Sequence, residues 1–198
     1  MRLTTISAGF LLAISLTSWA CSRATTVASV PNSSGTEAPG QASGDLRYKV
    51  PDGWVAEQPS SKMRVAQFKL PKADGDNEDA GLVLYYFGAN QGGTAEANID
   101  RWISQIQQSD GSSSKDKAKS EALTVNGVKI TAVDVSGRYT AEMAPGSGKF
   151  YDNANYRLRA AVIETPKGNY FLKLVGPAKT VGRWEQSFTD YLKSFEFK

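Results

Sequence analysis

The sequence predicts an α+β fold, in which an antiparallel sheet of about six or seven strands carries two main helices. Short apolar runs bounded by turn residues recur along residues 44–198, with the length and spacing of strands. Asn126-Gly127 separates two of these runs and is a strong hairpin signal. Two other segments repeat their apolar residues at the period of a helix face. Residues 44–198 are therefore expected to form a single globular domain.

The expected strands coincide with the apolar runs, which in chain order are Leu46–Val50, Met63–Leu70, Gly81–Gly88, Leu123–Val125, Val128–Val135, Tyr156–Thr165, Tyr170–Val175 and Phe195–Phe197. In Gly81–Gly88 bulky apolar residues fall on both parities, which is typical of a central strand covered on both faces. In Val128–Val135 the apolar parity changes near Ala132. Either a bulge lies there or both faces of the strand are buried.

Two helices are expected, at Thr94–Gln107 and at about Pro177–Lys193. Each has an apolar stripe at helical spacing, formed by Ile99, Trp102, Ile103 and Ile106 in the first and by Val181, Trp184, Phe188, Tyr191 and Leu192 in the second. We therefore expect Trp102 and Trp184 to be largely buried as core residues. The second helix has a proline near its start, where a missing N–H is tolerated.

The first twenty residues have the layout of a secretory signal peptide. Arg2 supplies a positive charge, Ile6–Leu16 is almost uninterruptedly apolar, and Ser18-Trp19-Ala20 is a small-x-small cleavage signal. Residues 22–43 are mostly Ser, Thr, Ala, Pro, Gly and Val, a composition with too little bulky apolar surface to offset the entropy of ordering it. We expect residues 1–20 to be removed on export and residues 21–43 to form a flexible tether.

Cys21 follows the signal segment directly and is the only cysteine of the chain. Its position resembles that of the acylated first residue of a bacterial lipoprotein, which would carry palmitate-type chains and anchor the domain to a membrane. In the other interpretation, Cys21 is left as a free thiol on a soluble periplasmic or secreted protein. Ser18 and Trp19 depart from the usual lipoprotein cleavage motif, whereas the tether suits a domain that stands off a bilayer.

The composition excludes several classes of function. The chain has no histidine and one cysteine, so Ser-His-Asp and Cys-His catalytic sites, histidine-bearing zinc sites and intramolecular disulfides are absent. Its formal charge of +3 is spread over interspersed cations and anions, so we expect no nucleic-acid partner. No cofactor and no metal site are expected either. The acidic run Asp74–Asp79 fails as an EF-hand, because Tyr85 stands where the bidentate glutamate should be.

Two loops remain as candidate contact sites. Gly88–Thr94 joins a strand to a helix but lacks the lysine of a phosphate-binding loop, so we interpret it as a connection that ends in a helix cap. The long segment Glu142–Asn155 is the better candidate, because Met143, Phe150 and Tyr151 lie there among small and polar residues. We predict that it is a mobile binding loop.

The domain resembles the Mog1/PsbP-like superfamily at its two ends, Tyr48–Trp54 (YKVPDGW) and Tyr191–Phe197 (YLKSFEF). Phe87–Trp102 and Leu174–Val181 are similar to a bacterial subgroup of exported lipoproteins whose function is uncharacterised. The resemblance implies an antiparallel sheet between helices, an α/β/α sandwich, with a non-catalytic binding or assembly role. It carries over no catalytic residue and no metal or photosystem contact.

Two functional hypotheses follow. The first is a non-enzymatic binding or accessory module, tethered to the bacterial cell envelope, that engages a protein partner or a small ligand through its loops. The alternative is a small carboxylate-dependent hydrolase or carbohydrate-active enzyme using acids such as Asp134, Glu142, Asp152 or Glu164. That alternative requires two of these acids to face one cleft.

Overall fold

The computed structural model describes residues 45–198. The predicted signal peptide (1–20), the tether (21–43) and Cys21 lie outside the described residues. Within residues 45–198, no helix has the length and apolar character needed to span a membrane.

The core of the domain is an eight-stranded antiparallel sheet, in which β6 pairs with β7 beside the strand order β2-β3-β4-β9-β8-β7-β5. Its strands are β2 (Val55–Ala56), β3 (Arg64–Leu70), β4 (Ala80–Tyr86), β5 (Ile106–Gln107), β6 (Lys119–Val125), β7 (Val128–Tyr139), β8 (Asn153–Thr165) and β9 (Gly168–Pro177). A separate two-stranded sheet pairs β1 (Leu46–Arg47) with β10 (Glu196–Phe197). This arrangement confirms the predicted α+β class with an antiparallel sheet.

The helices are α1 (Ala95–Ile103), α2 (Ser114–Lys117), α3 (Ala178–Arg183) and α4 (Glu185–Lys193). The single helix predicted at Pro177–Lys193 is wrong, because the backbone of Trp184 leaves the helical region and separates α3 from α4. The helix predicted at Thr94–Gln107 ends earlier than expected, at Ile103. Its last residues, Ile106 and Gln107, pair with the end of β7 instead, so sheet hydrogen bonds replace the helical ones.

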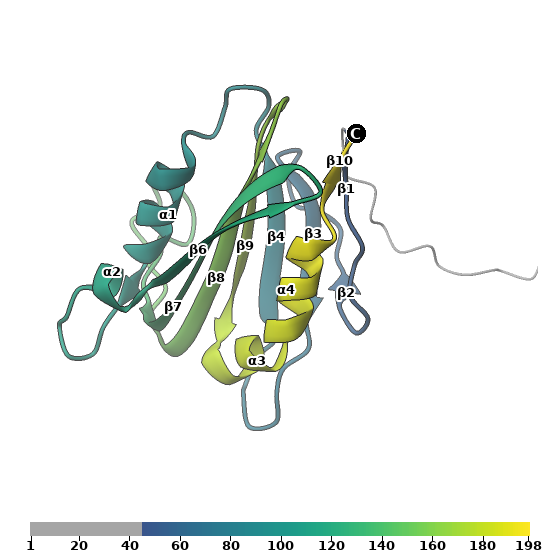
Figure 1. The fold of residues 1–198 in the computed structure, drawn as a ribbon. Coiled ribbons are helices and arrows are strands. Elements are labelled where there is room, and N and C mark those ends of the chain that lie inside the picture. Colours follow the sequence, from purple (N-terminus) through teal and green to yellow (C-terminus); the bar gives the residue numbers. More distant parts are fainter. Residues whose placement is uncertain (1–44) are drawn as a thin grey trace, which may run out of the picture. The chain divides into compact units, whose positions relative to one another are not determined.

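The sheet has two differently covered faces, which we name by their main helices. The α4 face carries α3 and α4, and its core includes Phe68, Leu82, Leu172, Phe188 and Tyr191. The α1 face carries α1, which contacts β7 and β8. Figure 1 shows α1 at the β7–β8 end of the sheet and α4 at the β3–β4 end.

Trp102 and Trp184 differ in burial. Trp102 is 3% exposed in the core of the α1 face, which confirms the prediction for the first helix. Trp184 is more exposed than Trp102, but it packs against the core of the α4 face, in agreement with the expectation that it is largely buried. It lies at the junction of α3 and α4, where its indole N–H donates to the carbonyl of Pro71 at 2.8 Å. Its ring lies against Gly53, at which an added Cβ would be 2.8 Å from it.

The hairpin at Asn126-Gly127 is present, and both residues have the positive φ angles that this turn requires. In the following strand, Ile130 is buried on the α4 face and Val133 on the α1 face. Both faces of this strand are therefore buried, and its pairing with β8 is regular past Ala132. The register shifts only between Gly137 and Tyr139.

Candidate functional site

One half of the α1 face is open. On β4, Leu82 and Leu84 point to the α4 face and are fully buried, whereas Val83 and Tyr85 point to the α1 face and are half-buried. Gly81 shows the same openness, because an added Cβ there would meet nothing within 4 Å. By the register of β4 with β9, Lys173 and Val175 lie beside these residues. We call Gly81, Val83, Tyr85, Lys173 and Val175 the open half of the α1 face.

The position of α1 explains this opening. Its buried side chains, among them Trp102, pack mainly over β7 and β8, in a core that also contains Phe171 of β9 and that Tyr85 of β4 contacts at its border. The strand predicted at Gly81–Gly88 is therefore fully covered on the α4 face and only partly covered on the α1 face. Among the described residues no helix lies over the α1 face of β3 and β4, as Figure 1 shows.

Lys173 is the central polar residue of this surface. Its backbone pairs with Val83 on β4 and with Ala160 on β8, so its side chain rises from the middle of the sheet. The ammonium Nζ donates to Oε1 of Gln105 at 2.5 Å and to the hydroxyl oxygen of Tyr139 at 3.0 Å. It also lies 5.0 Å from the centroid of the Tyr139 ring.

The charge of Lys173 has no acidic counterpart. No ion pair within residues 45–198 involves Lys173, and the charged group that most affects it is the guanidinium of Arg101, which is also positive. Burial and, to a smaller extent, Arg101 lower the pKa of Lys173 to about 8. The surface thus holds a half-buried cation that only neutral groups of the protein stabilise.

Aromatic rings flank Lys173 on two sides. On β4 the rings of Tyr85 and Phe87 stack with centroids 5.9 Å apart, and the guanidinium of Arg64 lies 5.6 Å from the Tyr85 ring. On the other side, the rings of Tyr139 and Tyr151 lie 5.3 Å apart. Burial raises the pKa of Tyr139 to about 12, so its hydroxyl keeps its proton near neutral pH.

The predicted binding loop reaches this surface through one residue. Tyr151 is exposed and packs on Tyr139, whereas Met143 and Phe150 are exposed without a ring contact to the open half. The loop is also more regular than expected, because Glu142 forms a β-bridge with Phe150 and its carboxylate accepts the amides of two loop glycines. A binding role for Met143, Phe150 and Tyr151 stays a prediction.

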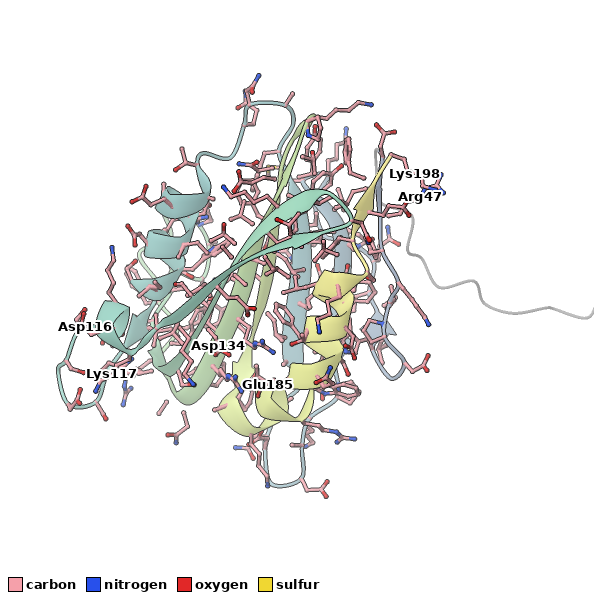
Figure 2. The ribbon with its side chains drawn as sticks, in the orientation of Figure 1. Arg47, Asp116, Lys117, Asp134, Glu185 and Lys198 are labelled. Carbon is pink, nitrogen blue, oxygen red and sulfur yellow. The ribbon has the colours of Figure 1, made fainter. Side chains whose placement is uncertain are left out.

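The four acids of the hydrolase alternative are held by separate partners within the domain: Asp134 by Arg157, Glu142 by loop amides, Asp152 by Arg138 and Glu164 by Lys129. Figure 2 shows Asp134 near Glu185, and Arg157 binds both carboxylates. The hydrogen bond from Arg157 lowers the pKa of Glu185. A general acid needs a raised pKa, so this pair does not favour glycosidase chemistry.

The acidic run Asp74–Asp79 serves local structure. Asp76 accepts two hydrogen bonds from Thr180 in α3, and Asp79 accepts the amide of Lys72 at 2.9 Å. Within residues 45–198 no group of three acidic, cysteine or histidine side chains is placed to hold a metal ion.

In the loop Gly88–Thr94, Thr94 caps α1 by accepting a hydrogen bond from the amide of Ala97, as expected.

A cavity of about 470 Å³ lies between α1, β5 and α2. Ile103 and Ile106 form part of its apolar lining, and Lys115 and Asp100 pair at 3.0 Å on its polar side. Because these two charges neutralise each other, the described lining of the cavity presents no unpaired charge to a ligand. The open half of the α1 face is therefore the stronger candidate site.

Sequence reasoning missed Lys173, although a signal was present. Lys173 is the only charged residue in the apolar run Tyr170–Val175, and it has the same parity as Phe171 and Val175. A lysine on an otherwise apolar face of a strand indicates either that the strand lies at the edge of the sheet or that this face is not covered there. Here β9 is central, so the region is uncovered.

No protein-family model matches the chain, and no curated protein matches it. Among solved structures it is similar to LpqN of Mycobacterium tuberculosis, described as involved in cell envelope biogenesis. That match has 13% identity over 82% of this chain and 87% of LpqN, with a TM-score of 0.49.

A second similar structure is cyanobacterial PsbP from Synechocystis, at 14% identity over 85% of this chain and 99% of that chain, with a TM-score of 0.46. A third is a Pseudomonas aeruginosa protein of unknown function, at 12% identity over 71% and 94%, with a TM-score of 0.43. The similar structures thus include a PsbP protein.

Proposed function

We propose that this chain is a non-enzymatic binding or accessory module of the bacterial cell envelope, and that it holds its ligand or partner on the open half of the α1 face. The observation that carries the proposal is Lys173, a half-buried cation without an acidic partner in the described domain. Beside it lie two aromatic pairs, each with one exposed ring, Phe87 in the first and Tyr151 in the second. Such a charge costs folding free energy, which a ligand that neutralises it would recover.

The surface has the composition of a binding site in other respects. Tyr85 and Tyr151 present rigid rings that bury area at low conformational cost and also carry a hydroxyl group, and Tyr151 packs on the buried ring of Tyr139. Arg64 and Arg101 add positive charge at its margins. The rest of the domain supplies a rigid sheet underneath, so the site needs little ordering when it binds.

Site-specific photo-crosslinking in intact cells tests the proposal. A photoreactive phenylalanine analogue is placed at Phe87 or Tyr151, both exposed beside the open half, and as a control at Gln186, exposed on α4 on the opposite face. Crosslinks from Phe87 and Tyr151 that are absent from Gln186 support the proposal. Crosslinks from Gln186 alone, or from no position, contradict it.

Envelope attachment is the second part of the proposal. We infer that the chain is exported, that Cys21 is acylated after cleavage, and that residues 22–43 tether the domain to the membrane. Cys21→Ser should move the protein from the membrane fraction to the soluble fraction. A mature wild-type mass with an unmodified Cys21 would exclude the anchor without affecting the binding proposal.

A further inference from the structure

Lys173 and Tyr139 together have two hydrogen-bond donors without an acceptor. An ammonium group has three N–H donors, and two of those of Lys173 are used by Gln105 and the Tyr139 oxygen. Tyr139 accepts that bond, so its own hydroxyl hydrogen is free to donate elsewhere, and within residues 45–198 no acceptor takes it. One charged and one neutral donor therefore converge at the border between the open half and the core under α1, where Tyr139 is 6% exposed.

The charges around this point favour a negatively charged ligand. Arg101 on α1 adds a second positive charge nearby, and Arg64 on β3 is held over Tyr85 with a hydrogen bond to Gln67. Glu57 and Glu78 are engaged with other residues: Glu57 binds Gln67 and Lys69, and Glu78 binds the hydroxyl of Tyr156. These two donors, one of them on a fixed ammonium, match the two oxygens and the negative charge of a carboxylate.

The aromatic rings define the rest of the ligand. Tyr85 on β4 and Tyr151 of the loop flank the Lys173–Tyr139 pair, and Val83 and Val175 provide apolar contact beside it. A planar or apolar body attached to the carboxylate would pack between these side chains. A small hydrophilic anion would leave them exposed to water.

We propose that the open half of the α1 face binds a carboxylate attached to an aromatic or apolar body, with the carboxylate on Lys173 and Tyr139 and the body against Tyr85 and Tyr151. This inference rests on the proposed function, since it names the ligand class of the same surface. The partner is thus an organic monoanion, and a neutral ligand or a phosphate would be a different assignment.

Benzoate is the probe that tests this assignment, with benzyl alcohol as its neutral analogue and inorganic phosphate as the competing anion. Binding is measured by NMR on lysine-labelled protein through the side-chain signal of Lys173. Benzoate should bind and raise the pKa of Lys173, because the charged form gains a partner. Benzyl alcohol should bind at least about tenfold more weakly, the equivalent of one charge-assisted hydrogen bond. Phosphate should also bind more weakly than benzoate, because it has no ring to pack against Tyr85 and Tyr151.

Variants assign the contact. Lys173→Met should weaken benzoate binding by about tenfold or more, and Tyr139→Phe, which keeps the ring but loses the donor, by a few-fold. Lys193→Met, at an exposed α4 position, is the matched control and should change nothing. Unchanged affinity in Lys173→Met, equal binding of benzyl alcohol, tighter binding of phosphate, or no benzoate binding at all would each overturn the assignment.

The two proposals fail separately. If crosslinks from Phe87 and Tyr151 persist in a Lys173→Met background, the open half is a binding surface but its ligand is not recognised as an anion. If those crosslinks never form while benzoate binds through Lys173, the carboxylate site exists and the envelope-binding proposal is wrong.

Discussion

Replacing Lys173 by methionine should stabilise the domain at neutral pH. The pKa of Lys173 falls from the ordinary 10.5 to about 8, and this difference corresponds to about 3 kcal/mol of cost for keeping the side chain charged in the fold. Methionine keeps most of the length without the charge. It also loses the hydrogen bonds to Gln105 and Tyr139, which contribute about 1 kcal/mol each, so the net gain should be about 1 kcal/mol.

The pH dependence provides the decisive test. The folded protein releases the Lys173 proton near pH 8, whereas the unfolded chain holds it until its ordinary pKa of 10.5. In this window the unfolded state binds more protons, so the contribution of Lys173 to stability rises with pH. The advantage of Lys173→Met should therefore shrink, and then reverse, between about pH 7 and about pH 10.

Urea unfolding of both proteins at these two pH values measures the effect. Lys193→Met is the control, because Lys193 is exposed on α4 and should show no such dependence. A Lys173→Met variant that is less stable than wild type at both pH values, with a constant difference, would refute the description of Lys173 as an uncompensated cation.

Four further results are expected. Trp102→Ala should lower the free energy of unfolding by about 3–5 kcal/mol in urea titrations, because Trp102 is a buried core residue; a cost near zero would show that α1 does not pack on the sheet. Gly176→Ala should lower the melting temperature sharply, since an added Cβ would lie 2.6 Å from Ala80, whereas Gly81→Ala should leave it nearly unchanged. Equal effects at the two glycines would contradict the open half. Phe150→Ala, at a 59% exposed position, should alter the melting temperature little while weakening any capture that depends on the loop. Asp134→Ala should cost about 2 kcal/mol or more, because it leaves Arg157 and Arg159 without their shared carboxylate, and a neutral effect in the same urea assay would contradict that pairing.

The fold could largely be predicted from local patterns. Strand parity and the Asn126-Gly127 turn place the main hairpins correctly, because both signals act over a few residues. The break at Trp184 could not be predicted, since the apolar stripe keeps its helical spacing across both α3 and α4. The spacing of apolar residues indicates which residues face the core. It does not show whether the backbone changes direction between two short helices.

The candidate site was harder to predict than the fold. Parity assigns Val83 and Tyr85 to one face of β4, but whether that face is covered depends on where α1 packs. The position of Lys173 depends on the long-range pairing of β4 with β9, which brings it beside residues about ninety positions earlier in the chain. The loop residue Tyr151 was identified from composition, whereas Lys173 required the topology.

The central claim is that the open half of the α1 face, with Lys173 at its centre, is the surface on which this domain binds. Acetylation footprinting tests it most directly, by comparing the rates at which Lys173 and Lys193 of the protein react in buffer and in the presence of solubilised envelopes. The account predicts that envelope components protect Lys173 selectively and leave Lys193 unchanged. Unchanged reactivity of Lys173, or protection of Lys193 instead, would contradict it.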